Sequence, residues 1–234
     1  MPIRAVIFDL DGTLLDTLAD VAAAANAALR DCGFPEHPLP AYRMLLGGGV
    51  HRLFADALPA GAGTPEQIER CVAAFGRHYR RMWNETTRPF TGIIELIDGL
   101  HRRGLKLAVL SNKPHEFTRE CIAAHFGADD AAATGTSSSL GASIGPFLFV
   151  VGQRAGVPVK PDPASAMEIA DALGVSPADV LYLGDTSIDM QTARRAGMRA
   201  VGVLWGFRDR AELERAGAEV VIATPEELLT LLAE

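Results

Sequence analysis

From residue 91 onward, short apolar runs alternate with segments of helical periodicity. The apolar runs cover 105–110, 147–151, 180–183, 200–203 and 219–222, and the helical segments cover 91–103, 114–126, 162–173, 187–196, 209–216 and 225–233. Such alternation builds a parallel sheet, because each parallel crossover needs a long, usually helical connection. A further buried strand is expected at residues 5–10. The sequence therefore predicts an α/β fold with helices on both faces of a parallel sheet.

Between the first strand and this alternation, only helical patterns occur. Helices are predicted at residues 18–32, 49–58 and 64–84, the last of them with Thr64 as its N-cap and Pro65 as its first residue. Residues 34–41 contain three prolines and are expected to form a connector. We predict that residues 17–90 form an all-helical cap domain, inserted into a core domain of residues 1–16 and 91–234.

Composition excludes several classes of function. The formal net charge is −7 and no basic face is evident, so no nucleic-acid partner is expected. The three cysteines lie far apart, which argues against a disulfide framework or a zinc site and favours a reducing cytoplasm. No apolar run approaches the roughly 18 residues of a membrane span, and the first one is too short and too acidic for a signal peptide. We expect a soluble, cytoplasmic protein.

Residues 128–146 differ from the rest of this half of the chain. They are small, polar and rich in glycine and serine, with few large apolar residues to pack into a core. They join a predicted helix to a predicted strand, and that junction lies at the amino edge of a parallel sheet. We predict a surface loop away from any ligand.

Polar residues follow the predicted strands where ligands bind in open parallel sheets, beyond the carboxyl ends. These residues are Asp9, Asp11 and Thr13 after the first strand; Ser111, Asn112 and Lys113 after the second; Lys160 after the third; and Asp185 and Asp189 after the fourth. Each alone has an ordinary explanation as a turn, a helix cap or a solvated side chain. Their common placement at one sheet edge favours a site.

Converging carboxylates repel one another, and a hard divalent cation removes the conflict. Mg²⁺ takes oxygen ligands, which the carboxylates of Asp9 and Asp185 and the backbone carbonyl of Asp11 can supply. Asp9 can then attack phosphorus, while Lys160 and Ser111 stabilise the phosphoryl oxygens. Asp11 can protonate the leaving group and later accept a proton from water. The pattern predicts a magnesium-dependent phosphatase.

Four strings in this order resemble the motifs of the haloacid dehalogenase superfamily of phosphohydrolases. They are FDLDGTLLDT at 8–17, LSNK around Ser111, VKPDP around Lys160 and GDTSID at 184–189. The resemblance covers nearly the whole chain except 128–146. It implies a Rossmann-like core, an inserted helical cap and dependence on Mg²⁺. It also implies Asp9 as nucleophile, Asp11 as acid and base, Ser111 and Lys160 as phosphate ligands, and metal ligation by Asp9, Asp11, Asp185 and Asp189, the last directly or through water.

Further strings at 45–58, 90–100, 111–122 and 196–232 are similar to the phosphoglycolate phosphatase branch. The branch implies a small phosphorylated metabolite as partner, 2-phosphoglycolate first, in a monomer or homodimer. Related members that act on pyrophosphate, nucleotides or sugar phosphates, including mutases, stay open as alternatives. Thr13 and Asn112 are expected to bind substrate.

In the predicted cap, Arg43 precedes a turn at residues 47–49, and its planar guanidinium suits a substrate carboxylate. A surface salt bridge is an equal alternative for Arg43. Trp205 and Phe207, after the strand at 200–203, are expected to be packing residues.

Other reactions and roles fit less well. A haloalkanoate dehalogenase would need neither Asp11 nor a metal, and a phosphonate hydrolase would need a cap lysine, whereas residues 17–90 contain none. A non-catalytic phosphate sensor would not require both Asp9 and Asp11.

Overall fold

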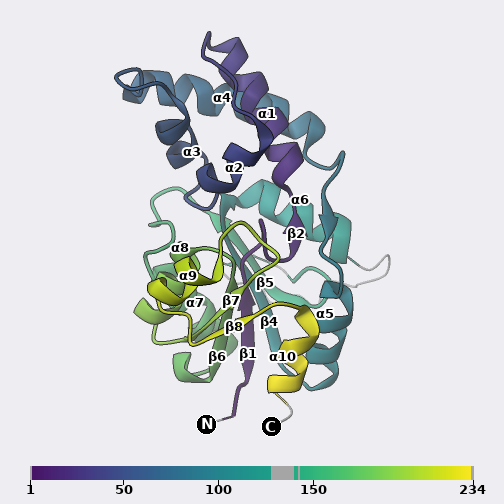
Figure 1. Cartoon of the computed structure of the whole chain (residues 1–234). Coiled ribbons are helices and arrows are strands. Elements are labelled where there is room, and N and C mark those ends of the chain that lie inside the picture. The colour runs from purple at the N-terminus through teal and green to yellow at the C-terminus, as the bar shows by residue number, and fades with distance from the viewer. Residues whose placement is uncertain (1, 128–139, 142, 233–234) are drawn as a thin grey trace.

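The computed structural model describes residues 2–127, 140, 141 and 143–232. A six-stranded sheet forms the centre, in the order β5-β4-β1-β6-β7-β8, and all of its pairs are parallel (Figure 1). Its strands are β1 (Ala5–Phe8), β4 (Lys106–Pro114), β5 (Phe147–Gln153), β6 (Val180–Gly184), β7 (Arg199–Val203) and β8 (Val220–Ile222). The α/β prediction is confirmed, and the order changes direction at β1, the usual place for a site in such sheets.

Each face of the sheet has its own apolar core. Val6 and Phe8 of β1 face one core, with helices α5 (Ile93–Arg102), α6 (His115–Phe126) and α10 (Pro225–Leu231). Ala5 and Ile7 face the other core, with α7 (Ala164–Leu173), α8 (Ser187–Arg195) and α9 (Arg210–Ala216). Strands buried on both faces explain why the sequence shows continuous apolar runs instead of alternation. The short 3₁₀ helix η1 (Pro177–Asp179) leads into β6.

Four helices, α1 (Leu18–Asp31), α2 (Leu39–Leu45), α3 (Val50–Ala57) and α4 (Pro65–Met82), pack around a third apolar cluster of their own. They stand together beyond the carboxyl ends of the strands (Figure 1). Helix α2 corrects one prediction, since the connector expected at 34–41 is helical from Leu39. Pro40 lies in the first turn, where its missing N–H leaves no helical hydrogen bond unmade.

The expectation that 17–90 is all helical is also wrong at its end. Strand β3 (Arg88–Pro89) pairs antiparallel with β2 (Leu15–Asp16), so the two chain crossings between the sheet and the helices run side by side. Two-residue strands carry too little pattern for the sequence to predict them. Strand β4 extends four residues further than expected, so that Ser111, Asn112 and Lys113 lie within it.

Most of the glycine- and serine-rich segment predicted as a surface loop, 128–139 and 142, lies outside the described residues. Its end is described, and there Leu140 is buried against the core that contains Phe149. Within the described ranges, no helix has both the length and the apolar character needed to cross a membrane.

A buried carboxylate ties helix α1 to the residues just before β3. Asp20, in the first turn of α1, accepts hydrogen bonds from the backbone N–H groups and hydroxyls of Thr86 and Thr87, at 2.6–3.0 Å. Burial acts to raise the pKa of Asp20, but these hydrogen bonds outweigh it and hold the pKa below its ordinary value. The charged form therefore stabilises the native state.

We predict that Asp20→Asn lowers the free energy of unfolding by about 3 kcal/mol at pH 7. The NH₂ group of asparagine would face the N–H and hydroxyl donors of Thr86 and Thr87, which would lose their acceptor. A lowered native pKa gives stability that is complete above about pH 4 and is lost as pH falls below it. Urea unfolding should show the gap between wild type and variant closing in acid. Asp16→Asn, which removes an exposed carboxylate nearby, should change little; an equal loss there would contradict this role for Asp20.

Candidate active site

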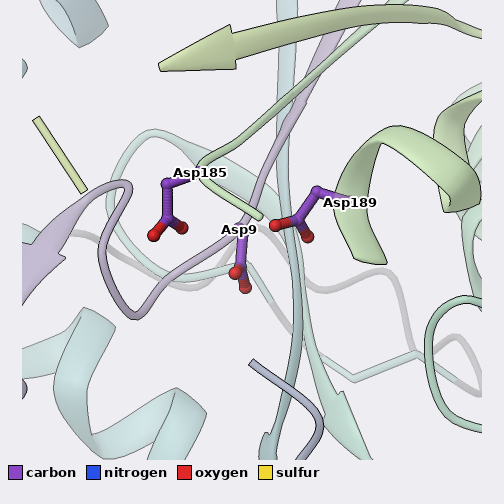
Figure 2. Close-up of side chains that lie close together, drawn as sticks. All are labelled: Asp9, Asp185 and Asp189. Carbon is purple, nitrogen blue, oxygen red and sulfur yellow. The ribbon is translucent and has the colours of Figure 1, made fainter. Parts of the chain in front are cut away.

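Three carboxylates converge at the switch point of the sheet. Asp9 follows β1, Asp185 follows β6 and Asp189 lies in the first turn of α8; all are buried (Figure 2). One oxygen from each lies within 4.8 Å of the others. Neighbouring parallel strands end at the same edge, so residues more than 170 positions apart in the sequence meet here.

The ammonium of Lys160 lies against two of these carboxylates, 2.8 Å from Asp9 Oδ1 and 2.7 Å from Asp189 Oδ1. Asn112 fixes the Lys160 backbone, since its Oδ1 accepts from the Lys160 N–H at 2.8 Å and its Nδ2 donates to the Lys160 carbonyl at 3.1 Å. The ring of Tyr182 lies beneath, 5.9 Å from the ammonium. One positive charge thus faces three negative ones in a buried site.

The excess of negative charge and the burial of the site both raise carboxyl pKa values. Burial raises the pKa of Asp9 to about 7, although Lys160 acts to lower it. Burial, followed by the charges of Asp189 and Asp9, raises the pKa of Asp185 well above its ordinary value. A divalent cation would supply the missing positive charge, and the donors are the hard oxygens that such ions prefer. The residues present fit a divalent metal ion.

Asp185 is held from both sides. Its Oδ1 accepts from the Thr13 hydroxyl at 3.0 Å and its Oδ2 from the Phe207 N–H at 2.7 Å. A Cβ built on Gly12, which has φ +87°, would lie 2.3 Å from Asp185 Oδ2, and one on Gly206 would lie 2.3 Å from Asp185 Cβ. Only glycine leaves room for this carboxylate.

The segment 205–208 does more than the packing predicted for it. The Trp205 indole donates to the Thr13 carbonyl at 2.9 Å, and the Phe207 N–H holds Asp185. The Arg208 guanidinium donates to the carbonyls of Met44 and Leu46 at 3.2 and 3.1 Å. No sequence signal marked these contacts, because most of them use backbone atoms.

Asp11 stands apart from the three carboxylates. Its Oδ1 accepts from the Lys113 ammonium at 2.6 Å and from the Thr17 hydroxyl at 2.7 Å. Lys113 also lies over the ring of Tyr79, 4.9 Å from its centroid. Burial acts to lower the pKa of Lys113, but the negative charge of Asp11 outweighs burial, and the pKa lies above its ordinary value. The sequence places Lys113 at the end of its strand but predicts no role for it.

A small cavity of about 50 Å³ lies between the sheet edge and the helices. From the sheet side it is lined by Asp9, Asp11, Ser111, Asn112, Lys113 and Pro114; from the helices by Val21, Val50, Leu53, Phe75 and Tyr79; and from the α2–α3 turn by Leu46, Gly47 and Gly49. Asn112 Nδ2 donates to the Gly47 carbonyl at 3.0 Å and so joins the two sides. Pockets for drug-sized ligands hold roughly 300–1,000 Å³, so this cavity suits a small substrate.

Two predicted substrate-binding residues lie elsewhere. Arg43 is exposed, donates to the Gly206 carbonyl and is not part of the cavity lining. Thr13 also lies outside the lining and binds Asp185. Arg43 precedes the cavity-lining loop by one helical turn, but its side chain points to Gly206 instead of the cavity. Sequence spacing gives the position of a residue and not the direction of its side chain.

The family model for haloacid dehalogenase-like hydrolases matches residues 3–197. A phosphoglycolate phosphatase of Nitrosospira multiformis is 28% identical over 99% of this chain and 96% of its own. An N-acetylmuramic acid 6-phosphate phosphatase of Pseudomonas aeruginosa is 29% identical over 99% and 96%. A solved structure from Lactobacillus delbrueckii, described as a provisional phosphoglycolate phosphatase, is 31% identical, covers 99% of both chains and has a TM-score of 0.86.

We predict that Mg²⁺ raises the midpoint of thermal unfolding. At one hundred times its dissociation constant a ligand adds about 2.7 kcal/mol, or roughly 5–10 °C for a chain of this size. Asp185→Asn should lose this shift, whereas Glu214→Gln, an exposed change on α9, should keep it. Matched ionic strength with NaCl is the control, and an equal Mg²⁺ shift in Asp185→Asn would place the ion elsewhere.

Proposed function

This chain belongs to the haloacid dehalogenase-like hydrolases, and we propose that it is a phosphatase that hydrolyses a small phosphate monoester through an aspartyl-phosphate on Asp9. The observation that carries the proposal is the buried group of Asp9, Asp185, Asp189 and Lys160 below a cavity that Asp9 and Asp11 line. The helices α1–α4 would act as the cap over this cavity.

Asp9 is oriented for attack. Its Oδ1 accepts from the Leu10 N–H at 2.7 Å and from Lys160 at 2.8 Å, and Oδ2 takes part in neither contact. In the first step a bond forms between Oδ2 and phosphorus while the bond from phosphorus to the ester oxygen breaks. Lys160, which contacts Asp9, and Ser111, which lines the same cavity as Asp9, would stabilise the phosphoryl oxygens.

Asp11 would move the protons. Protonated, it donates to the departing ester oxygen, which leaves as an alcohol. The resulting carboxylate then accepts a proton from the water that attacks phosphorus, and that attack releases phosphate and restores Asp9. Thr17 and Lys113 hold the Asp11 side chain in place for both steps.

The metal ion in this proposal is Mg²⁺, with the carboxylates of Asp9 and Asp185 and the carbonyl of Asp11 as ligands. When bound, it neutralises charge on the phosphoryl oxygens. Asp189 would act through water, because its Oδ1 binds Lys160 and its Oδ2 accepts from the Thr186 N–H and hydroxyl at 3.1 and 2.6 Å.

The substrate favoured here is 2-phosphoglycolate, the substrate in the names of several relatives. A sugar phosphate is the second candidate, supported by the Pseudomonas aeruginosa relative named for one. The three cysteines are free thiols, in keeping with the cytoplasm as location, and a monomer or homodimer is expected.

We predict that Asp9→Asn lowers kcat at least about 1,000-fold while the circular dichroism spectrum stays that of wild type, because the amide is a poor nucleophile. Asp98→Asn, an exposed change on α5, is the matched control. Phosphate release near the wild-type rate from Asp9→Asn would rule out the aspartyl-phosphate.

A phosphate-release assay with Mg²⁺ tests the substrate. The panel contains 2-phosphoglycolate, N-acetylmuramic acid 6-phosphate, other sugar phosphates, nucleoside monophosphates and pyrophosphate, with Asp9→Asn as the blank. We expect the highest kcat/KM with 2-phosphoglycolate. A higher value for any other compound would replace it, and no release from any of them would refute the proposed phosphatase.

A further inference from the structure

The cavity over Asp9 has its charged residues on the sheet side and uncharged residues on the helical side. Its helical wall is formed by Val21, Val50, Leu53, Phe75 and Tyr79, which carry no charge. Among the described residues that line it, Lys113 is the single cation. A substrate with a second negative group therefore meets one positive partner in the cavity, and that partner comes from β4 instead of the helices.

Lys113 is placed to receive such a group. Its side chain is only 5% exposed, and its ammonium contacts Asp11 Oδ1 at 2.6 Å and the Tyr79 ring at 4.9 Å. An ammonium has three N–H donors, and Asp11 Oδ1 is one acceptor. The ammonium therefore has donors beyond the one that Asp11 Oδ1 accepts.

The position of Lys113 beside Asp11 sets what it can recognise. In the proposed reaction Asp11 contacts the ester oxygen, and Lys113 lies one hydrogen bond from Asp11. In a 2-phosphorylated carboxylic acid, a single carbon separates the ester oxygen from the carboxylate. The carboxylate is therefore within reach of Lys113 when the ester oxygen meets Asp11.

We propose that Lys113 is a specificity-determining residue, which binds a substrate carboxylate one carbon away from the ester oxygen. This inference rests on the proposed function and deepens it, and it gives to Lys113 the task that the sequence suggested for Arg43. A leaving group without a charge would gain from Lys113 only through the hold of Lys113 on Asp11.

The test compares two substrates of one shape, 2-phosphoglycolate and its neutral amide, glycolamide phosphate. The ratio of their kcat/KM values is measured for wild type, Lys113→Met and Lys113→Arg. Loss of the Asp11 contact slows both substrates and cancels in the ratio. We expect Lys113→Met to lower the ratio by about 10- to 100-fold, the worth of a hydrogen bond between charged groups, and Lys113→Arg to restore much of it.

An unchanged ratio in Lys113→Met would overturn the inference and leave the phosphatase standing. If wild type hydrolyses neither ester nor any other in the panel, the proposed function itself fails. Binding then still tests Lys113: calorimetry of 2-phosphoglycolate with Asp9→Asn should show an affinity that the added Lys113→Met weakens by about 10-fold or more. Equal affinity of the two would overturn the inference, and thermal unfolding checks that both fold.

Discussion

The contact of the Lys160 ammonium with Asp9 and Asp189 is the interaction on which the site depends. Three carboxylates buried at one sheet edge would otherwise repel each other, and the cost would fall on the folded state. Lys160 offsets only part of that cost, which is why the remaining charge suits a divalent ion. The lysine is in turn placed by Asn112, whose amide binds both backbone groups of Lys160 and also the Gly47 carbonyl in the helical region.

The sheet and the helices supply different parts of the chemistry. Among the described residues that line the cavity, the charged ones all come from the strand ends, whereas the helices supply apolar walls. Such walls exclude water and make the charges beneath interact more strongly. The paired crossings β2 and β3 and the hydrogen bonds to Asp20 hold these two parts together. In the proposed reaction the strand ends therefore contact both the phosphoryl group and the leaving group, and the helices enclose them.

The sequence predicted the sheet, most helices and the gathering of Asp9, Lys160 and Asp185, because strand-end position alone decides where such residues meet. It could not predict the direction in which a side chain leaves a helix, and Arg43, expected at the substrate, instead donates to the Gly206 carbonyl and does not line the cavity. Backbone donors such as the Phe207 N–H leave no trace in residue identity. Lys113 was visible in the sequence, but its meaning depends on Asp11 and Tyr79, which come from other elements.

The segment 205–208 touches the carboxylate of Asp185, the loop after β1 and the end of α2 within four consecutive residues. In the other direction, the Arg43 side chain of α2 donates a hydrogen bond to the Gly206 carbonyl. Anyone who transplants the helical insert of a related enzyme onto this sheet would thus disturb the hydrogen bonds that hold Asp185, even with all three carboxylates of the site kept. A chimaeric protein therefore has to take the helical insert and residues 205–208 from the same parent protein.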